Sequence, residues 1–334
     1  GSFTINIPLY HHTQVRMMIG NADLVILLSP EKETNVAINL SNPPGKQFVF
    51  SGQYATINNE WCQPELITKI PPVYSDGDLL DSIVGISANE FKKRCINQYK
   101  RYVTHNSAQL QFSEDTRTLA NLSCAFDCLE NLQATHYCLQ TAYQKKENIT
   151  REQAFAAFLD VYLPDDFHNY LKDFPVNHPL ALYCYNYRNV VMDLYDTHKD
   201  PLAYEKNLLK NAPLTKEEQT LIHQYETAFK AGISFQQESE LMALSAKYFK
   251  ENDQFRWESF SKAKERLSNI IQDSTSLIVD YIRAIYMRSS FYNLQPLTPR
   301  QELMASEITN PIFLGIIQDM NRQMQPRQQT ITKK

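Results

Sequence analysis

Glycine and long apolar runs are both scarce in this sequence. Only 8 of its 334 residues are glycine, whereas average usage of about 7% would give roughly three times as many. Folds that need many tight glycine turns, such as propellers, β-helices and glycine-rich dinucleotide-binding folds, are therefore not expected. No stretch of the sequence contains about 18 uninterrupted apolar residues, so we expect no membrane-spanning helix.

Net charge and cysteine content are also low. A net charge of −4 gives no overall attraction to nucleic acid, so we expect no nucleic-acid partner. Six cysteines are too few for a disulfide-stapled scaffold. We expect them to be free, mostly buried thiols of a protein in a reducing compartment. We interpret Gly1-Ser2 as the remnant of a cleaved tag.

The N-terminal part of the chain has the pattern of short strands. A length of 334 residues suggests two domains or one large one. We assign residues 3–75 to a small β-rich region with an irregular connector after about residue 57. The expected strands are residues 3–7, 15–19, 24–28, 36–40 and 48–50.

The rest of the chain has helical periodicity. We expect a helical body over 76–212, a long helical hairpin with further helices over 213–324, and a disordered basic tail over 325–334. Apolar positions spaced by three and four, Met242 among them, predict two long antiparallel helices between 214 and 289 that pack along an apolar seam, separated by the polar stretch 250–254. The predicted fold class is mainly α, with a small N-terminal antiparallel β region.

Cys124 is the first candidate for chemistry. Asn121 or Ser123 could cap a helix over 122–145, which would place this thiol in the first turn, where the helix dipole favours the thiolate. Locally, residues 122–129 resemble the nucleophile helix of papain-like, deubiquitinase and Ulp-type thiol hydrolases. The resemblance implies a histidine base and an acid that orients it. The available side chains are His178, His105 and His136 as bases and Asp115 as the acid. The alternative is a buried helical cysteine.

Two metal sites are also considered. Asp76-Gly77-Asp78 resembles a motif of metal-dependent protein phosphatases and the Asp-x-Asp pair of type-A glycosyltransferases, which implies that Asp76 and Asp78 hold a metal ion. The alternative is a turn followed by an acidic helix N-terminus. A zinc site of cysteines and histidine would need a chain break, because one unbroken helix places His136 about 12 Å beyond the cysteine pair. Its ligands would be Cys124, Cys128, His136 and Cys138.

Aromatic and basic side chains suggest binding surfaces. The chain has 19 tyrosines, and Tyr183, Tyr185 and Tyr187 alternate in a way that would form one aromatic face on an extended segment. Basic residues could meet acidic partners or lipid headgroups, or form ordinary solvated helix faces. They are Lys262, Lys264 and Arg266 on a helix and Arg322, Arg327, Lys333 and Lys334 near the C-terminus.

The whole chain, poor in glycine and rich in Asn, Gln, Lys and Tyr, resembles secreted effectors of intracellular bacterial pathogens. The resemblance implies virulence-related action inside the reducing cytosol of a host cell. We expect an interaction protein that binds a host protein through its helical, tyrosine-rich surface. One alternative is a cysteine-dependent protease, deubiquitinase or acyltransferase, and another is a metal-dependent phosphatase or glycosyltransferase. The sequence points to no particular cofactor.

Overall fold

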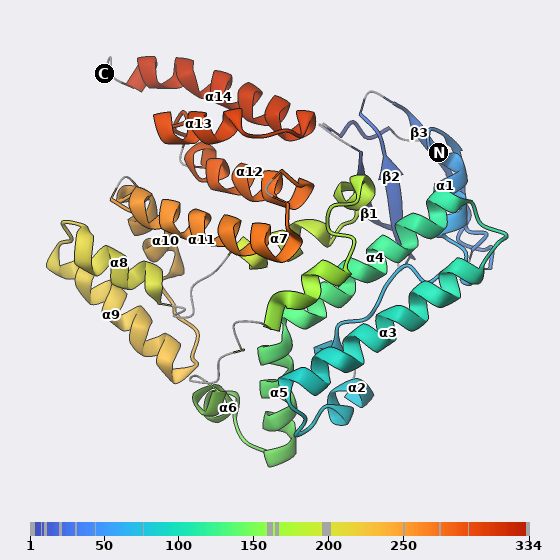
Figure 1. Cartoon of the computed structure of the whole chain (residues 1–334), viewed down its shortest axis with the longest axis horizontal. Coiled ribbons are helices and arrows are strands. Elements are labelled where there is room, and N and C mark those ends of the chain that lie inside the picture. Colours follow the sequence, from blue (N-terminus) through green and yellow to red (C-terminus); the bar gives the residue numbers. More distant parts are fainter. Residues whose placement is uncertain are drawn as a thin grey trace. The chain divides into compact units, whose positions relative to one another are not determined.

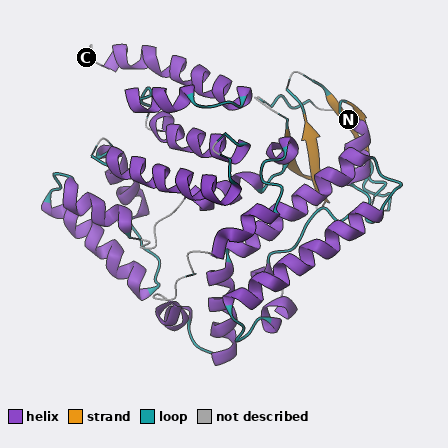
Figure 2. Ribbon diagram, in the orientation of Figure 1, coloured by secondary structure: helices purple, strands orange, loops and turns teal. Residues whose placement is uncertain are grey.

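The computed structural model is mainly helical, with two small antiparallel sheets near the N-terminus, which confirms the predicted fold class (Figures 1 and 2). It describes residues 4–7, 9, 12–19, 22–30, 32–43, 45–75, 77–158, 163, 167–195, 202–249, 251–273, 275–292 and 294–331.

The chain forms two compact units, each built from separate stretches. The first contains residues 1–76, 89–134 and 173–190, and the second contains 77–88, 135–172 and 191–334. The units therefore interleave along the chain, whereas the expected regions are consecutive.

The first unit combines the β region with two long helices. Its elements are β1 (Thr13–Ile19), β2 (Ala22–Leu28), β3 (Thr34–Ile38), β4 (Phe48–Gly52), α1 (Ala55–Trp61), η1 (Val73–Ser75), α3 (Ala88–Ala108), α4 (Glu114–Gln133) and η3 (Pro179–Tyr183). Helix α7 (Tyr187–Tyr195) begins in this unit and ends in the second.

The strands form two separate ribbons. β1 pairs with β2, and β3 pairs with β4, both antiparallel. One face of each ribbon contributes to a shared apolar core, in which Leu24 and Ile26 of β2 meet Phe48 and Phe50 of β4. The strand predicted at residues 3–7 is wrong for the described residues 4–7, which lie outside any strand. Alternation of side chains alone does not make a strand, because a strand also needs a hydrogen-bonded neighbour.

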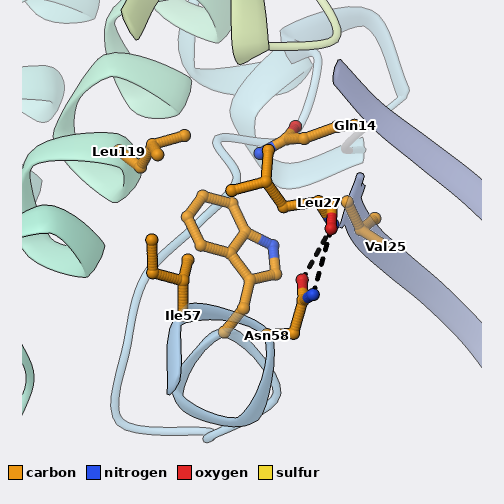
Figure 3. A pocket seen from close by; sticks show the side chains of 7 residues that line it. Gln14, Val25, Leu27, Ile57, Asn58 and Leu119 are labelled. Carbon is orange, nitrogen blue, oxygen red and sulfur yellow. Dashed lines mark hydrogen bonds between the residues drawn. The ribbon is translucent and has the colours of Figure 1, made fainter. Parts of the chain in front are cut away.

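Two consecutive asparagines on α1 attach this helix to both ribbons. Asn58 accepts a hydrogen bond from the Leu27 N–H (2.8 Å) and donates to the Leu27 carbonyl (3.1 Å). Asn59 does the same with Phe50, at 2.8 and 3.1 Å. Figure 3 shows the first pair as dashed lines, in a space that Ile57 and Leu119 also line. Trp61 also lines this space, and the side chains leave no room for a water-sized molecule.

An extended segment, residues 66–73, is held by side chains of α3 and α4. Asn106 accepts a hydrogen bond from the Ile67 N–H at 3.0 Å and donates one to the Ile67 carbonyl at 2.8 Å. Asp127 accepts from the Ile70 N–H (2.6 Å), and Asn131 accepts from the Val73 N–H (2.9 Å). Side chains thus replace the neighbouring strand that a buried extended backbone normally requires.

The second unit is helical. Its elements are α2 (Gly77–Ser82), α5 (Thr135–Glu147), α6 (Arg151–Phe158), η2 (Phe167–Asp173), α8 (Ala203–Asn211), α9 (Lys216–Ala231), α10 (Glu238–Lys247), α11 (Asp253–Ile271), α12 (Leu277–Tyr292), α13 (Pro299–Ser306) and α14 (Pro311–Ile331). Helix α12 packs against α11, α13 and α14.

The predicted pair of long helices is wrong, because each is broken into two. Helix α9 ends at Gly232, whose φ of 69° closes its C-terminus, and α11 ends at Gln272 with a φ of 59°. Glycine reaches this left-handed region without steric cost, which makes Gly232 an effective helix stop. Helices α11 and α12 still form a hairpin, but α10 is a separate short helix whose Met242, expected in the seam, is 70% exposed.

A buried ion pair lies beneath the start of α14. Asp280 is completely buried and pairs with Arg283 at 2.7 Å. The other oxygen of Asp280 accepts hydrogen bonds from the backbone N–H groups of Thr309 and Asn310, immediately before α14. Helix α14 continues to Ile331 and so extends into the tail that we expected to be disordered.

Candidate functional site

Cys124 does not lie at a helix N-terminus. Helix α4 begins after Ser113, whose hydroxyl accepts a hydrogen bond from the Thr116 N–H, so Cys124 lies in the middle of the helix. The side chain is completely buried, and its thiol donates to the Ile67 carbonyl at 3.3 Å. Burial, reinforced by the nearby charge of Asp127, raises the pKa of this thiol to about 12. A nucleophilic cysteine needs the opposite shift.

The histidines proposed as its base have other roles. His105 is exposed and donates to the Glu65 carbonyl at 2.8 Å, while the His178 ring accepts from the Leu180 N–H and caps η3. Asp115 is an exposed residue of the first turn of α4, where its negative charge interacts favourably with the positive end of the helix dipole. Among the described residues, no histidine interacts with the Cys124 thiol, whose environment is that of a structural cysteine.

The metal-site candidates are not assembled in the structure. Asp76 lies outside the described residues, and Asp78 is an exposed residue in the first turn of α2. Nowhere in the described part of the chain do three His, Cys, Asp or Glu side chains gather as they would around a metal ion. This also applies to the zinc candidates: His136 donates instead to the Phe158 carbonyl at 2.8 Å.

Part of the expected aromatic and basic surfaces is engaged within the fold, and the side chains of Arg327, Lys333 and Lys334 lie outside the described residues. Tyr187 is buried and donates to the Val176 carbonyl, whereas Tyr185 is 65% exposed. Lys264 pairs with Glu307 at 2.9 Å, and Arg266 donates to the Leu194 carbonyl at 2.6 Å. Neither of these two basic side chains is therefore available as part of a continuous basic patch with the exposed Lys262.

A hollow of about 450 Å³ lies between α9 and the region that begins α10. Its charged lining consists of three glutamates and one lysine, and the rest is mostly polar. The lining residues are Lys216, Glu217, Glu218, Thr220, Leu221, Gln224, Gln237 and Glu240. The excess of acid, together with the exposed amides, suits a cationic ligand with hydrogen-bonding groups.

A network around Glu218 fixes one end of the hollow. This carboxylate accepts from the Thr215 N–H (2.8 Å), from Lys247 (2.6 Å) and from the Tyr248 hydroxyl (2.9 Å). The hydrogen bond from Lys247 is the main reason that the pKa of Glu218 falls to about 2. The network joins the start of α9 to the end of α10, while Glu217 and Glu240 stay exposed along the hollow.

Apolar side chains are also exposed on this helical pair. Ile233, just after α9, is 55% exposed, and Met242 on α10 is 70% exposed. The opposite side of the pair packs on Leu208 of α8 through Ile222 and Leu244. From the sequence we expected Met242 in a helix seam and did not predict the hollow. The sequence signal for the hollow was Gly232, a glycine inside the expected long helix that could end it.

Comparison with known proteins gives no further guidance: no family model, no curated protein and no solved structure matches the chain. None of the helices in the described ranges combines the length and the apolar character needed to cross a membrane.

Proposed function

We propose that this chain is an interaction protein and that the hollow between α9 and α10 binds a basic segment of a protein partner. The observation that supports the proposal is the acid-rich lining of an open hollow, in which the carboxylates of Glu217 and Glu240 are exposed. A basic helix has the complementary chemistry: its cations would meet Glu217 and Glu240, and its shorter apolar side chains would lie against Leu221. Following the resemblance of the whole sequence, we propose a protein of a host cell as the partner.

The charges define how such a segment would be recognised. Glu218 already pairs with Lys247, so Glu217 and Glu240 are the exposed carboxylates of the lining that contribute to attraction. Exposed charge pairs contribute modestly, about 0.2–1 kcal/mol each. Reversing both charges replaces two attractions with two repulsions, so we expect binding to weaken by roughly tenfold.

The test uses a fluorescent peptide with lysine and leucine at helical spacing, titrated against the full chain by polarisation. The control peptide has glutamate in place of lysine. We expect saturable binding of the basic peptide, weakened about tenfold by Glu217→Lys with Glu240→Lys. The matched protein control is Glu258→Lys with Glu265→Lys, an equal charge change on exposed positions of α11. Equal weakening by both double variants, or no preference for the basic peptide, would refute the proposal.

A further inference from the structure

The ribbon of β3 and β4 has one edge covered by α1 and one edge that is open as far as the described residues show. On β4, both backbone groups of Phe50 bond to Asn59, so they point away from β3. Phe50 lies opposite Val36 in the register. In an antiparallel pair, hydrogen-bonded and non-hydrogen-bonded positions alternate, so the N–H and C=O of Val36 also point away from the ribbon.

The same alternation assigns the rest of β3. Backbone bonds from Asn39 to Gln47 and from Gln53 to Glu33 lie on the bonded positions of the ladder. Thr34, Val36 and Ile38 therefore direct their backbone groups outward. Across the described ranges, the outward groups of Val36 hydrogen-bond to no other segment.

The β3 strand itself lacks proline, charged side chains and bulges, three features that often prevent edge pairing. Natural edge strands are protected by lysine, proline, bulges or inward-pointing charges. The sequence Thr-Asn-Val-Ala-Ile of β3 has no proline and no charge. Its register with β4 is continuous, without a bulge. Val36 and Ile38 pack on the ribbon core but are only partly buried, so a neighbouring strand would complete their burial.

We propose that β3 pairs antiparallel with β3 of a second copy of the chain, across a two-fold axis at Val36, to make a continuous four-stranded sheet. The strand is complementary to itself in this register. Val36 meets its own equivalent, Thr34 meets Ile38, and about six backbone hydrogen bonds form. Beyond the strand, Glu33 faces Asn39 of the second copy, so no like charges oppose each other. Closed two-fold symmetry is the commonest arrangement of homo-oligomers.

The first test measures mass in solution. The full chain is examined by analytical ultracentrifugation across a concentration series, and we expect a monomer–dimer equilibrium. Val36→Pro removes the outward N–H and no ladder bond of β3 with β4, a substitution that edge strands tolerate. It should weaken the dimer by at least about tenfold, because two bonds across the axis are lost. Unchanged circular dichroism and unfolding midpoint would show that the variant folds. A chain that is monomeric throughout the series overturns the proposal.

The second test fixes the register without depending on proline. Asn35 and Ala37 are exposed, and the proposed register places each opposite the other in the second copy, at about 4.5 Å between Cα atoms. The double variant Asn35→Cys with Ala37→Cys should therefore form a disulfide-linked dimer on mild oxidation, whereas each single variant should not. Efficient linking of a single variant would overturn this register. A chain that dimerises only after residues 3–7 are deleted would overturn the proposal in favour of an edge covered by its own N-terminal segment.

Discussion

Replacing Asp127 with asparagine should change how the stability of the protein depends on pH. The carboxyl is 7% exposed and accepts hydrogen bonds from the Ile70 N–H and from the Asn186 amide, both at 2.6 Å. Burial outweighs these bonds and raises the pKa of Asp127 from 3.8 to about 6. A shift of about two units corresponds to roughly 3 kcal/mol.

The sign follows from proton binding. Between pH 4 and 6 the folded protein keeps the proton of Asp127 while the unfolded chain loses it, so stability falls as pH rises through this window. Above about pH 6 the whole penalty is present. Urea unfolding of the wild type and of Asp127→Asn at several pH values measures this difference. The free energy of unfolding of the wild type, relative to the variant, should fall by about 2–3 kcal/mol from pH 4 to pH 7. Parallel pH curves for the two proteins would refute the reasoning.

Three further predictions concern other parts of the fold. Native Cys124 should resist alkylation at pH 7 and react only after denaturation, as peptide mass mapping would show; rapid native labelling would restore the thiol-enzyme hypothesis. Asn58→Ala leaves the buried N–H and C=O of Leu27 without their partner, so urea unfolding should show a free energy of unfolding lower by about 2–4 kcal/mol. A decrease below about 0.5 kcal/mol would contradict a stabilising role for these two hydrogen bonds. Gly232→Ala should lower stability by about 1–2 kcal/mol, because φ is 69° and the new Cβ would lie 3.2 Å from Phe155; an unchanged melting temperature would contradict this strain.

Much of the fold follows from local patterns in the sequence. The apolar stretches 15–19 and 24–28 lie within β1 and β2, which pair with each other from Thr13–Leu28 to Ile19–Ala22. The helical texture after residue 78 is also correct. These features depend on residues that are close together in the chain.

The errors arise where distant residues decide the outcome. Cys124 was expected near a helix start, but Ser113, supported by a hydrogen bond to Glu60 of α1, begins the helix earlier. The Ser113-Glu114-Asp115 stretch was an available signal, since serine followed by acids is typical of a helix start. By contrast, nothing local indicates that Asn106 and Asn131 hold the segment 66–73, because the partners are far apart in sequence.

The candidate hollow could be predicted only in part. A glycine inside an amphipathic run can be tolerated within a helix or can end it, and the sequence alone does not decide between these outcomes. Once Gly232 ends α9, the residues that follow leave the expected seam, and Met242 becomes exposed. The break also brings Glu240 of α10 to the same hollow as Glu217 and Glu218 of α9. In one continuous helix these acids would lie far apart along the axis.

The extended segment 66–73 has a consequence for the order of events during synthesis. A ribosome synthesises this segment before it makes α3 and α4, which carry Asn106, Asp127 and Asn131, the side chains that hold the segment. Its backbone groups must stay hydrated until Asn131 has been added, so the segment can dock only late. Truncated nascent chains that end before residue 131 should therefore leave it open to proteases, and chains that extend past α4 should protect it.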